Sequence, residues 1–227
     1  MREIIFDLET TGLYPDRGDR IIEIGAVEII NKVKTGRFFH KFINPEREVS
    51  RAAFNVHGIS TEFLRDKPKF YDVIDDFLHF IAGDKLVIHN APFDMKFINY
   101  ELSMFDREKI AYERAVDTLV MARRKFPGSP ASLDALCKRF NINIDTRKAN
   151  GHGALLDSEL LYQVYICLTE GIQSELILNK AAALNNSGLD LQGNKEFTKP
   201  RKFSYEEDLE AHAEFIKKIP NALWSKV

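Results

Sequence analysis

The first 43 residues carry the hydrophobic pattern of β-strands. Residues 21–30, IIEIGAVEII, are rich in β-branched side chains. Residues 36–43, GRFFHKFI, continue the pattern after a polar Asn-Lys pair that suits a hairpin turn. An apolar run at residues 4–6 precedes both segments. The pattern therefore predicts three consecutive antiparallel strands, a meander, at the start of the chain.

Apolar residues at helical spacing begin at residue 71 and alternate with one further strand. Residues 71–83 have this spacing and end on Gly83, a residue type that commonly terminates helices. Residues 85–90 are almost wholly apolar, as in a strand buried on both faces, and Asn90 is expected to cap a helix at 91–105. Three more helices are predicted at 117–125, with Asp117 as its cap, at 132–139 and at 154–170. The chain is therefore expected to have an α/β fold, with a mixed central sheet flanked by helices.

The pattern weakens after residue 171. A stretch rich in Asn, Gly, Lys and Ser has few large apolar groups, and we expect a flexible C-terminal tail there. Helical periodicity returns from Tyr205, and Leu223 and Trp224 lie near the end. An apolar end on a tether suits a docking peptide, although a helix folded back on the domain would show the same pattern. We predict a domain at 1–175, a linker at 176–205 and a docking segment at 206–227.

Composition narrows the class of protein. Of 227 residues, 44% are hydrophobic and 29% are charged, and the formal net charge is −2. This balance argues against a protein that coats nucleic acid by bulk charge, but not against an enzyme that grips a strand end. The sequence shows no signal peptide and no apolar stretch near the ~20 residues that cross a bilayer, so we expect a cytoplasmic protein. Cys137 and Cys167 lie in apolar helical patterns and are expected to be reduced core residues.

Two acids lie one residue apart where the first strand ends, in DLETTGL at residues 7–13. Alternate residues of a strand face the same way, so Asp7 and Glu9 would lie side by side. Two carboxylates that close repel each other unless a cation lies between them, and hard divalent ions prefer oxygen ligands. A strand end that frays into water, with both acids hydrated, is the alternative.

Two distant acids and a histidine accompany this pair. Asp94 and Asp157 each fall in the first turn of a predicted helix, where the helix dipole alone would favour an acid. Asp157 lies on a largely apolar helix, however, and an unpaired acid there would be costly. His152 lies between two glycines just before that helix and could take a proton from water, although a lone histidine is more often structural.

Three stretches that contain these residues resemble exonuclease motifs. FDLETTGL, VIHNAPFDMKFINYEL and HGALLDSELL are similar, in order and spacing, to the motifs of the DEDDh family of 3′–5′ exonucleases. RIIEIGAVEI, FNVHGIS, DTLVMARRKFPG and SLDALCKRF extend the likeness over roughly residues 1–175, and the closing LW adds to it. Within that family the chain most resembles the proofreading subunits of bacterial DNA polymerase III. The resemblance implies a ribonuclease H-like exonuclease fold.

The resemblance also implies a role for each acid and for the histidine. Asp7, Glu9, Asp94 and Asp157 match the family's metal-binding carboxylates, and His152 matches its general base. Two Mg²⁺ or Mn²⁺ ions, about 3.5 to 4 Å apart, would activate water and stabilise the leaving 3′ oxygen. The product expected is a nucleoside 5′-monophosphate.

Substrate contacts follow from the same resemblance. His57 matches a position that touches the terminal nucleotide, and the backbone of residues 10–12 is expected near its sugar. Ala52 stands where a relative can carry a glutamate, so a contact there would be apolar or through the backbone. Phe93 could stack on a base or belong to the core. The predicted substrate-binding residues are Glu9, Thr10, Thr11, Gly12, Ala52, His57 and Phe93.

The implied partners are a DNA 3′ end, single-stranded or frayed, and other replication proteins. The terminal segment with Trp224 would bind the alpha subunit of DNA polymerase III, and the theta subunit is a further partner where it exists. QSELIL, Gln173–Leu178, resembles peptides that dock on the sliding clamp, although an ordinary helix end fits it equally well.

Three functions remain open at this stage. The leading hypothesis is a metal-dependent exodeoxyribonuclease that edits the primer terminus. The second is the same chemistry on RNA 3′ ends, against which the extended tail argues, since a free-standing RNA-trimming enzyme has no evident need of a docking peptide. The third is a catalytically silent scaffold that bridges clamp and polymerase. The four acids and the histidine argue against a scaffold, which would need none of them.

Overall fold

The computed structural model of the protein describes residues 1–145, 147 and 151–170. The predicted linker, the docking segment, the boundary at residue 175 and the Gln173–Leu178 motif lie outside the described residues. In the part of the chain that is described, no helix has both the length and the apolar character needed to cross a membrane.

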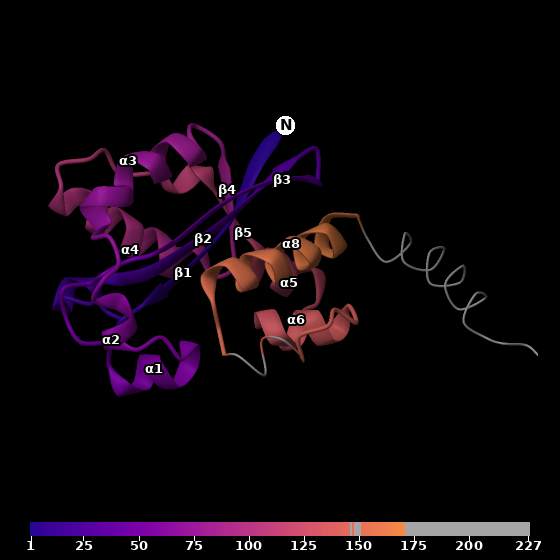
Figure 1. The fold of residues 1–227 in the computed structure, drawn as a ribbon. Helices are drawn as coiled ribbons and strands as arrows, with labels where there is room; N and C mark the ends of the chain where they lie inside the picture. The colour runs from indigo at the N-terminus through magenta and orange to yellow at the C-terminus, as the bar shows by residue number, and fades with distance from the viewer. Residues whose placement is uncertain (146, 148–150, 171–227) are drawn as a thin grey trace, which may run out of the picture. The chain divides into compact units, whose positions relative to one another are not determined.

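A mixed sheet of five strands forms the centre of the described part, in the order β3-β2-β1-β4-β5 (Figure 1). Strand β2 is antiparallel to both β1 and β3, whereas β4 runs parallel to β1 and β5 runs parallel to β4. The structure thus confirms the predicted meander and the mixed sheet. The strands are β1 (Arg2–Thr10), β2 (Ile21–Ile30), β3 (Val33–Phe42), β4 (Lys85–Ile88) and β5 (Ala115–Asp117).

A two-residue turn joins β2 to β3. Asn31 and Lys32 have φ angles of 51° and 68°, and a hairpin turn with positive φ at both central residues matches the twist of the two strands. The predicted hairpin is confirmed. Strand β3 starts at Val33, earlier than the predicted residue 36, because the pairing with β2 continues up to the turn.

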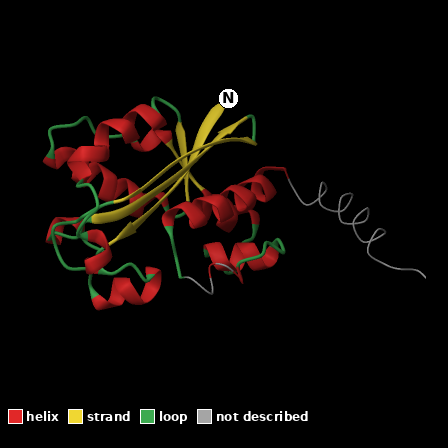
Figure 2. Cartoon of the chain, viewed as in Figure 1, coloured by secondary structure: helices red, strands yellow, loops and turns green. Residues whose placement is uncertain are grey.

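Helices cover both faces of the sheet (Figures 1 and 2). Ile4, Phe6 and Leu8 of β1 pack with one group of helices, and Ile5 packs with the other. The first group is α3 (Phe70–Ile81) and α4 (Ala91–Met104); the second is α5 (Thr118–Lys125), α6 (Leu133–Arg139) and α8 (Ala154–Glu170).

This alternation decides where the strand's acids point. Asp7 and Glu9 have the same parity as Ile5, so their side chains lie on the face that α8 covers. The sheet therefore directs both acids towards the start of α8.

The two cysteines belong to the core on the α8 side. Cys137 is fully buried there, and burial raises the pKa of its thiol to about 11, which keeps the thiol protonated. Cys167 is partly buried against the same cluster. Both therefore lie where the apolar helical pattern predicted.

Three predicted helix ends have different outcomes. Asp117 caps α5, since its carboxylate accepts hydrogen bonds from the amides of Leu119 and Val120. Asn90 occupies the predicted N-cap position of α4, but its backbone is left-handed (φ 68°) and its side chain makes no capping bond. Helix α3 ends at Ile81, one residue before Ala82 at φ 40°, and Gly83 does not occupy the terminating position.

Several short elements were not predicted. Helix α1 (Arg51–His57) is capped by Ser50 and α2 (Thr61–Leu64) by Ser60. The others are β5 and the 3₁₀ turns η1 (Pro15–Arg17) and η2 (Tyr112–Arg114). Each spans seven residues or fewer, which is too short for a hydrophobic period to stand out.

Candidate active site

Helix α8 lies directly on β2 at a glycine. A Cβ atom at Gly25 would lie 2.1 Å from the carbonyl carbon of Ala154, so no larger residue fits without a shift. The hydroxyl of Ser158 donates a hydrogen bond of 2.9 Å to the carbonyl oxygen of Gly25. This contact fixes the first turn of α8, and with it Asp157, against the sheet.

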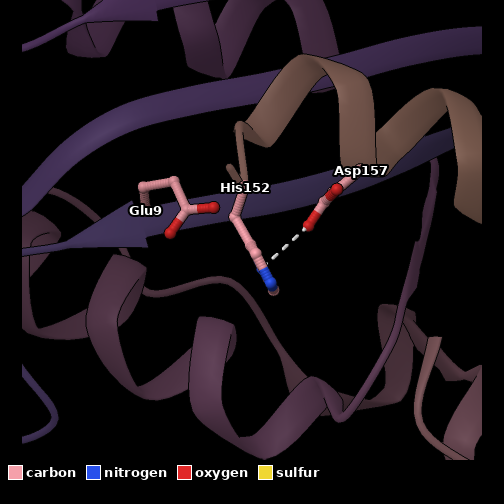
Figure 3. A group of neighbouring side chains, drawn as sticks. All are labelled: Glu9, His152 and Asp157. Atoms are coloured by element: carbon pink, nitrogen blue, oxygen red, sulfur yellow. Dashed lines mark ion pairs between the residues drawn. The ribbon is translucent and has the colours of Figure 1, made fainter. Parts of the chain in front are cut away.

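The first turn of α8 brings one predicted acid and the histidine to Glu9. Glu9, His152 and Asp157 each offer one possible ligand atom, and these three atoms lie within 4.8 Å of one another. Figure 3 shows the three side chains. Glu9 and Asp157 are buried, and His152 is partly exposed. Residues about 150 positions apart in the chain thus form one compact group of possible metal ligands.

Asp94 reaches the same place from the opposite face of the sheet. It lies in the first turn of α4 and is 3% exposed. Its carboxylate accepts hydrogen bonds from the amides of Asp94 and Leu8. The Leu8 amide is accessible because β4 pairs with β1 only as far as Ile5. The charge of Asp94 acts on Asp7, as do the charges of Glu9 and Asp157, so the four predicted acids converge.

Burial and mutual repulsion disfavour ionised carboxylates in this cluster. Loss of hydration raises the pKa of Glu9 to about 8, and the negative charges of Asp157 and Glu23 add to the effect. Loss of hydration, followed by the charge of Asp94, raises the pKa of Asp7 well above its ordinary value. Burial likewise raises the pKa of Asp94. Carboxylates that repel one another at short range, with only oxygen donors among them, fit a hard divalent cation.

His152 lies just outside α8. Gly151, with a φ angle of 82°, and Gly153 flank it, and its amide donates a hydrogen bond of 3.2 Å to the carbonyl of Val56. Its Nδ1 atom lies 3.3 Å from Oδ2 of Asp157, and its side chain is 38% exposed. The backbone contact therefore holds the residue beside the acids while the ring remains open to solvent.

The sequence reasoning missed Arg147. Its guanidinium makes two hydrogen bonds to Asp157, from Nε to Oδ1 at 2.6 Å and from Nη2 to Oδ2 at 2.9 Å. It also pairs with Asp134 of α6. Burial of Asp157 opposes ionisation, but the contacts with His152 and Arg147 outweigh it and lower the pKa of this acid. An arginine in the polar sequence DTRKANG gives no signal of such a role.

A fifth carboxylate, Glu23, was also missed. It lies opposite Glu9 in the β1–β2 register and is 3% exposed. Its Oε1 atom is 2.7 Å from Nε2 of His40, and its Oε2 atom has no hydrogen-bond partner among the described residues. The available signal was an acid within an otherwise apolar strand, IIEIGAVEII.

A cavity of about 490 Å³ opens beside Glu9. It contains most of the predicted substrate-binding residues, but not Thr11, which is fully buried and engaged with Asp19 and the amide of Arg20. Phe93 lines the cavity and also packs on the core, 5.0 Å from the ring of Phe97, so both roles considered for it have structural support. The predicted residues that line it are Glu9, Thr10, Gly12, Ala52, His57 and Phe93.

Two residues of the cavity wall have well-defined polar surroundings. A Cβ atom at Gly12 would lie 2.4 Å from the Asp19 carboxylate, so that carboxylate requires a glycine here. His57 is buried, and burial lowers the pKa of its ring, which is therefore neutral near pH 7. Its Nδ1 accepts a hydrogen bond from the amide of Ile59, which places the proton on Nε2. That Nε2 atom has no partner among the described residues.

Comparisons with known proteins identify the family of this chain. A family model of exonucleases matches residues 4–165. The DNA polymerase III subunit epsilon of Rickettsia felis is 51% identical over 228 residues, covering 96% of this chain and 97% of that one. The Escherichia coli subunit of the same name is 47% identical over 177 residues, covering 75% of this chain and 72% of the relative.

A solved structure shows the same fold. Exonuclease X, in complex with 5′ overhanging duplex DNA, matches with a TM-score of 0.59 and 28% identity, over 74% of this chain and 91% of that chain. The likeness, together with the family match, confirms the predicted ribonuclease H-like exonuclease fold.

Proposed function

The chain belongs to the exonuclease family and, within it, to the DNA polymerase III epsilon subunits, and we propose that it is the proofreading 3′–5′ exonuclease of a replicative DNA polymerase. One observation carries the proposal: four carboxylates and a histidine converge at one end of the central sheet, beside a cavity. The reaction is hydrolysis of the terminal phosphodiester, which releases a nucleoside 5′-monophosphate.

The acid cluster is the proposed binding site for two divalent ions, Mg²⁺ or Mn²⁺. Asp7, Glu9, Asp94 and Asp157 would hold them, since these carboxyl groups supply oxygen donors from both faces of the sheet. When bound, such ions supply the positive charge that the transition state of phosphodiester hydrolysis requires.

The remaining groups position the substrate and move a proton. His152 is the proposed general base, because its ring is partly exposed next to the acids and an imidazole nitrogen can accept a proton. The Nε2–H group of His57 is a donor for the terminal nucleotide. The backbone of Thr10 and Gly12 would lie along the sugar, with Ala52 and Phe93 as apolar contacts.

A preference for mispaired ends follows from the need for an unpaired strand. The cavity is proposed to hold the terminal nucleotide of one strand. A mispaired terminus costs less free energy to melt than a paired one, so it reaches the site more often.

The proposed partners are those of a replicative polymerase subunit. The relatives carry the name of a DNA polymerase III subunit, which supports assembly with the alpha subunit and action at the replisome in the cytoplasm. The terminal segment with Trp224 is the proposed contact with alpha. The Gln173–Leu178 motif is the proposed contact with the sliding clamp, and theta would bind where it exists.

Hydrolysis of single-stranded DNA with a mismatched 3′ end tests the enzyme. We expect Mg²⁺-dependent release of mononucleotides from the 3′ end, lowered by about a hundred- to a thousandfold in Asp7→Ala, because the loss of an electrostatic group in an active site costs ~10²–10³. Asp76→Ala, which alters an exposed acid of α3, serves as the control and should retain full activity.

Two outcomes would contradict the proposal. Absence of metal-dependent release, with Asp7→Ala like the wild type, would leave a scaffold as the better explanation. Faster trimming of an RNA of the same sequence would favour the RNA alternative, which the names of the relatives do not support.

A further inference from the structure

Arg147 contacts both an acid and the histidine of the proposed active site. Its side chain is 8% exposed, and its guanidinium holds both carboxylate oxygens of Asp157. The Nη2 atom that reaches Oδ2 also lies 2.9 Å from Nδ1 of His152. The guanidinium pairs with Asp134 as well, whose side chain is 57% exposed. One buried cation is therefore shared by Asp157 and His152.

The contact with Asp157 uses the atoms that a metal ion would need. A two-point arginine–carboxylate pair is among the strongest hydrogen-bonded ion pairs, because both oxygens accept from a planar, charged donor. Here both oxygens are engaged, and the carboxylate is 5% exposed. A divalent ion at Asp157 would lie beside the guanidinium, and the repulsion between the two cations would weaken one contact or the other.

The contact with His152 engages the atom that a base requires. Arginine can only donate, so Nδ1 of a neutral ring must accept from Nη2, and the ring proton is then on Nε2. A ring in that form has no lone pair left for water. A protonated ring would donate to Asp157 instead and also has no lone pair. The His152 ring can accept a proton only after Arg147 has moved away from Nδ1.

We propose that Arg147 is an internal competitor of the divalent metal at Asp157, and that its displacement by the metal frees His152. The proposal rests on the proposed function, since it assumes a divalent metal site at these acids. Asp134 gives the displaced guanidinium a second anion at the more exposed side of its present position. In this scheme, metal binding and the availability of the base are coupled through one side chain.

Calorimetric titration of the full-length protein with Mn²⁺ alone tests the competition. We expect Arg147→Gln to bind Mn²⁺ at least about tenfold more tightly than the wild type, which corresponds to about 1.4 kcal/mol. Arg147→Lys keeps the charge but cannot span both oxygens, so its affinity should lie between the two. Arg114→Gln is the matched control, because within the described part of the chain this arginine donates to backbone carbonyls near the end of α3 and contacts none of the acids of the site, and its Mn²⁺ affinity should equal that of the wild type.

Thermal unfolding separates competition from simple structural support. Without metal, Arg147→Gln should melt below the wild type because Asp157 loses its buried counter-charge. At saturating Mn²⁺ the difference should shrink, since the metal then takes over that role. If Arg147 only supports the fold, the difference would persist with Mn²⁺.

The outcomes distinguish this inference from the proposed function. The proposed competition is wrong if both Arg147 variants bind Mn²⁺ no more tightly than the wild type. If Arg147→Gln does not fold, the Mn²⁺ affinity of Arg147→Lys alone tests the proposal. A wild type that binds no Mn²⁺ overturns the metal site itself. A wild type that binds Mn²⁺, with variants no tighter, overturns only the role of Arg147.

Discussion

At the scale of single residues, the site is defined by acids that are held together against their repulsion. Glu9 and Asp157 are buried, and the pKa of Glu9 is raised to about 8 by burial and by neighbouring charges. Asp157 differs, since Arg147 and His152 lower its pKa despite burial. The cluster thus contains one acid with a cation already beside it and others whose ionisation the protein disfavours.

This arrangement predicts how stability varies with pH when divalent ions are removed. An unfolded glutamate loses its proton near pH 4.3, whereas Glu9 in the folded chain loses it near pH 8. Between about pH 4.3 and 8 the folded state therefore holds a proton that the unfolded state has lost, so stability falls as the pH rises from 7 to 8.5 and levels off above that. We expect a loss of about 1 kcal/mol, or roughly 3 °C in melting temperature, by thermal unfolding in EDTA.

Two comparisons check the cause of that loss. Glu9→Gln cannot titrate at this position, so its melting temperature should depend less on pH over the same range. Mg²⁺ should stabilise the wild type more at pH 8.5 than at pH 7. The depressed pKa of His57 acts in the opposite direction, but only below its ordinary value near 6.5. Equal pH dependence in wild type and Glu9→Gln would contradict the assignment.

Some residues of the site could be predicted from the sequence, and others could not. Asp7, Glu9, Asp94, His152 and Asp157 could be proposed because family motifs fix their order and spacing in the chain. Glu23 had only the weak signal of an acid in an apolar strand, and Arg147 had none, because their roles depend on strand register and on a contact with α8. Such contacts join parts of the chain that no local pattern connects.

At the scale of elements, the long apolar segments were predictable, whereas of the short ones only β4 and α6 were. Strand β2 and helix α8 have the predicted bounds, since each is a largely apolar run of ten or more residues. Helix α1 has seven residues and β5 has three, and both are stabilised by caps or by neighbouring strands more than by their own pattern. Asn90 stands at the predicted N-cap of α4, but its left-handed backbone is not the extended conformation of a side-chain cap, and no capping bond forms.

The packing of α8 on β2 can be tested at Gly25. A Cβ atom there would lie within 2.1–2.3 Å of backbone atoms of Ala154 and Leu155, and backbone cannot yield as a side chain can. We expect Gly25→Ala to lower the free energy of unfolding by about 3 kcal/mol in urea denaturation. It should also weaken Mn²⁺ binding, because Asp157 moves with the first turn of α8.

Gly83→Ala is the matched control for this change. A Cβ atom at Gly83 would have nothing within 4 Å, so its stability should stay within about 0.5 kcal/mol of the wild type. If Gly25→Ala were as stable as Gly83→Ala and bound Mn²⁺ normally, close packing of α8 on β2 would not be what positions Asp157.

At the scale of the whole molecule, the topology explains why the acids meet. Strand β1 lies in the middle of the sheet, antiparallel to β2 on one side and parallel to β4 on the other. Its end extends beyond the last residue paired with β4, so helices from both faces reach it with their first turns. The mixed sheet could be predicted from the meander. The convergence of α4 and α8 could not, because it depends on how these helices pack on the sheet.

The catalytic residues and the partner-binding segments are proposed to lie in separate parts of the chain. All five proposed catalytic residues lie within residues 1–170, so a chain that ends at Lys180 should hydrolyse single-stranded DNA at nearly the full-length rate. It should lose the alpha subunit in a pull-down, because the proposed contact with Trp224 is gone, but retain the clamp through Gln173–Leu178.

The full-length chain with Gln173→Ala and Leu176→Ala is the reciprocal control, and we expect it to keep alpha and lose the clamp. If the shortened chain still bound alpha, the docking role of the terminal segment would be wrong, whereas loss of hydrolysis would show that the exonuclease unit depends on residues beyond 180.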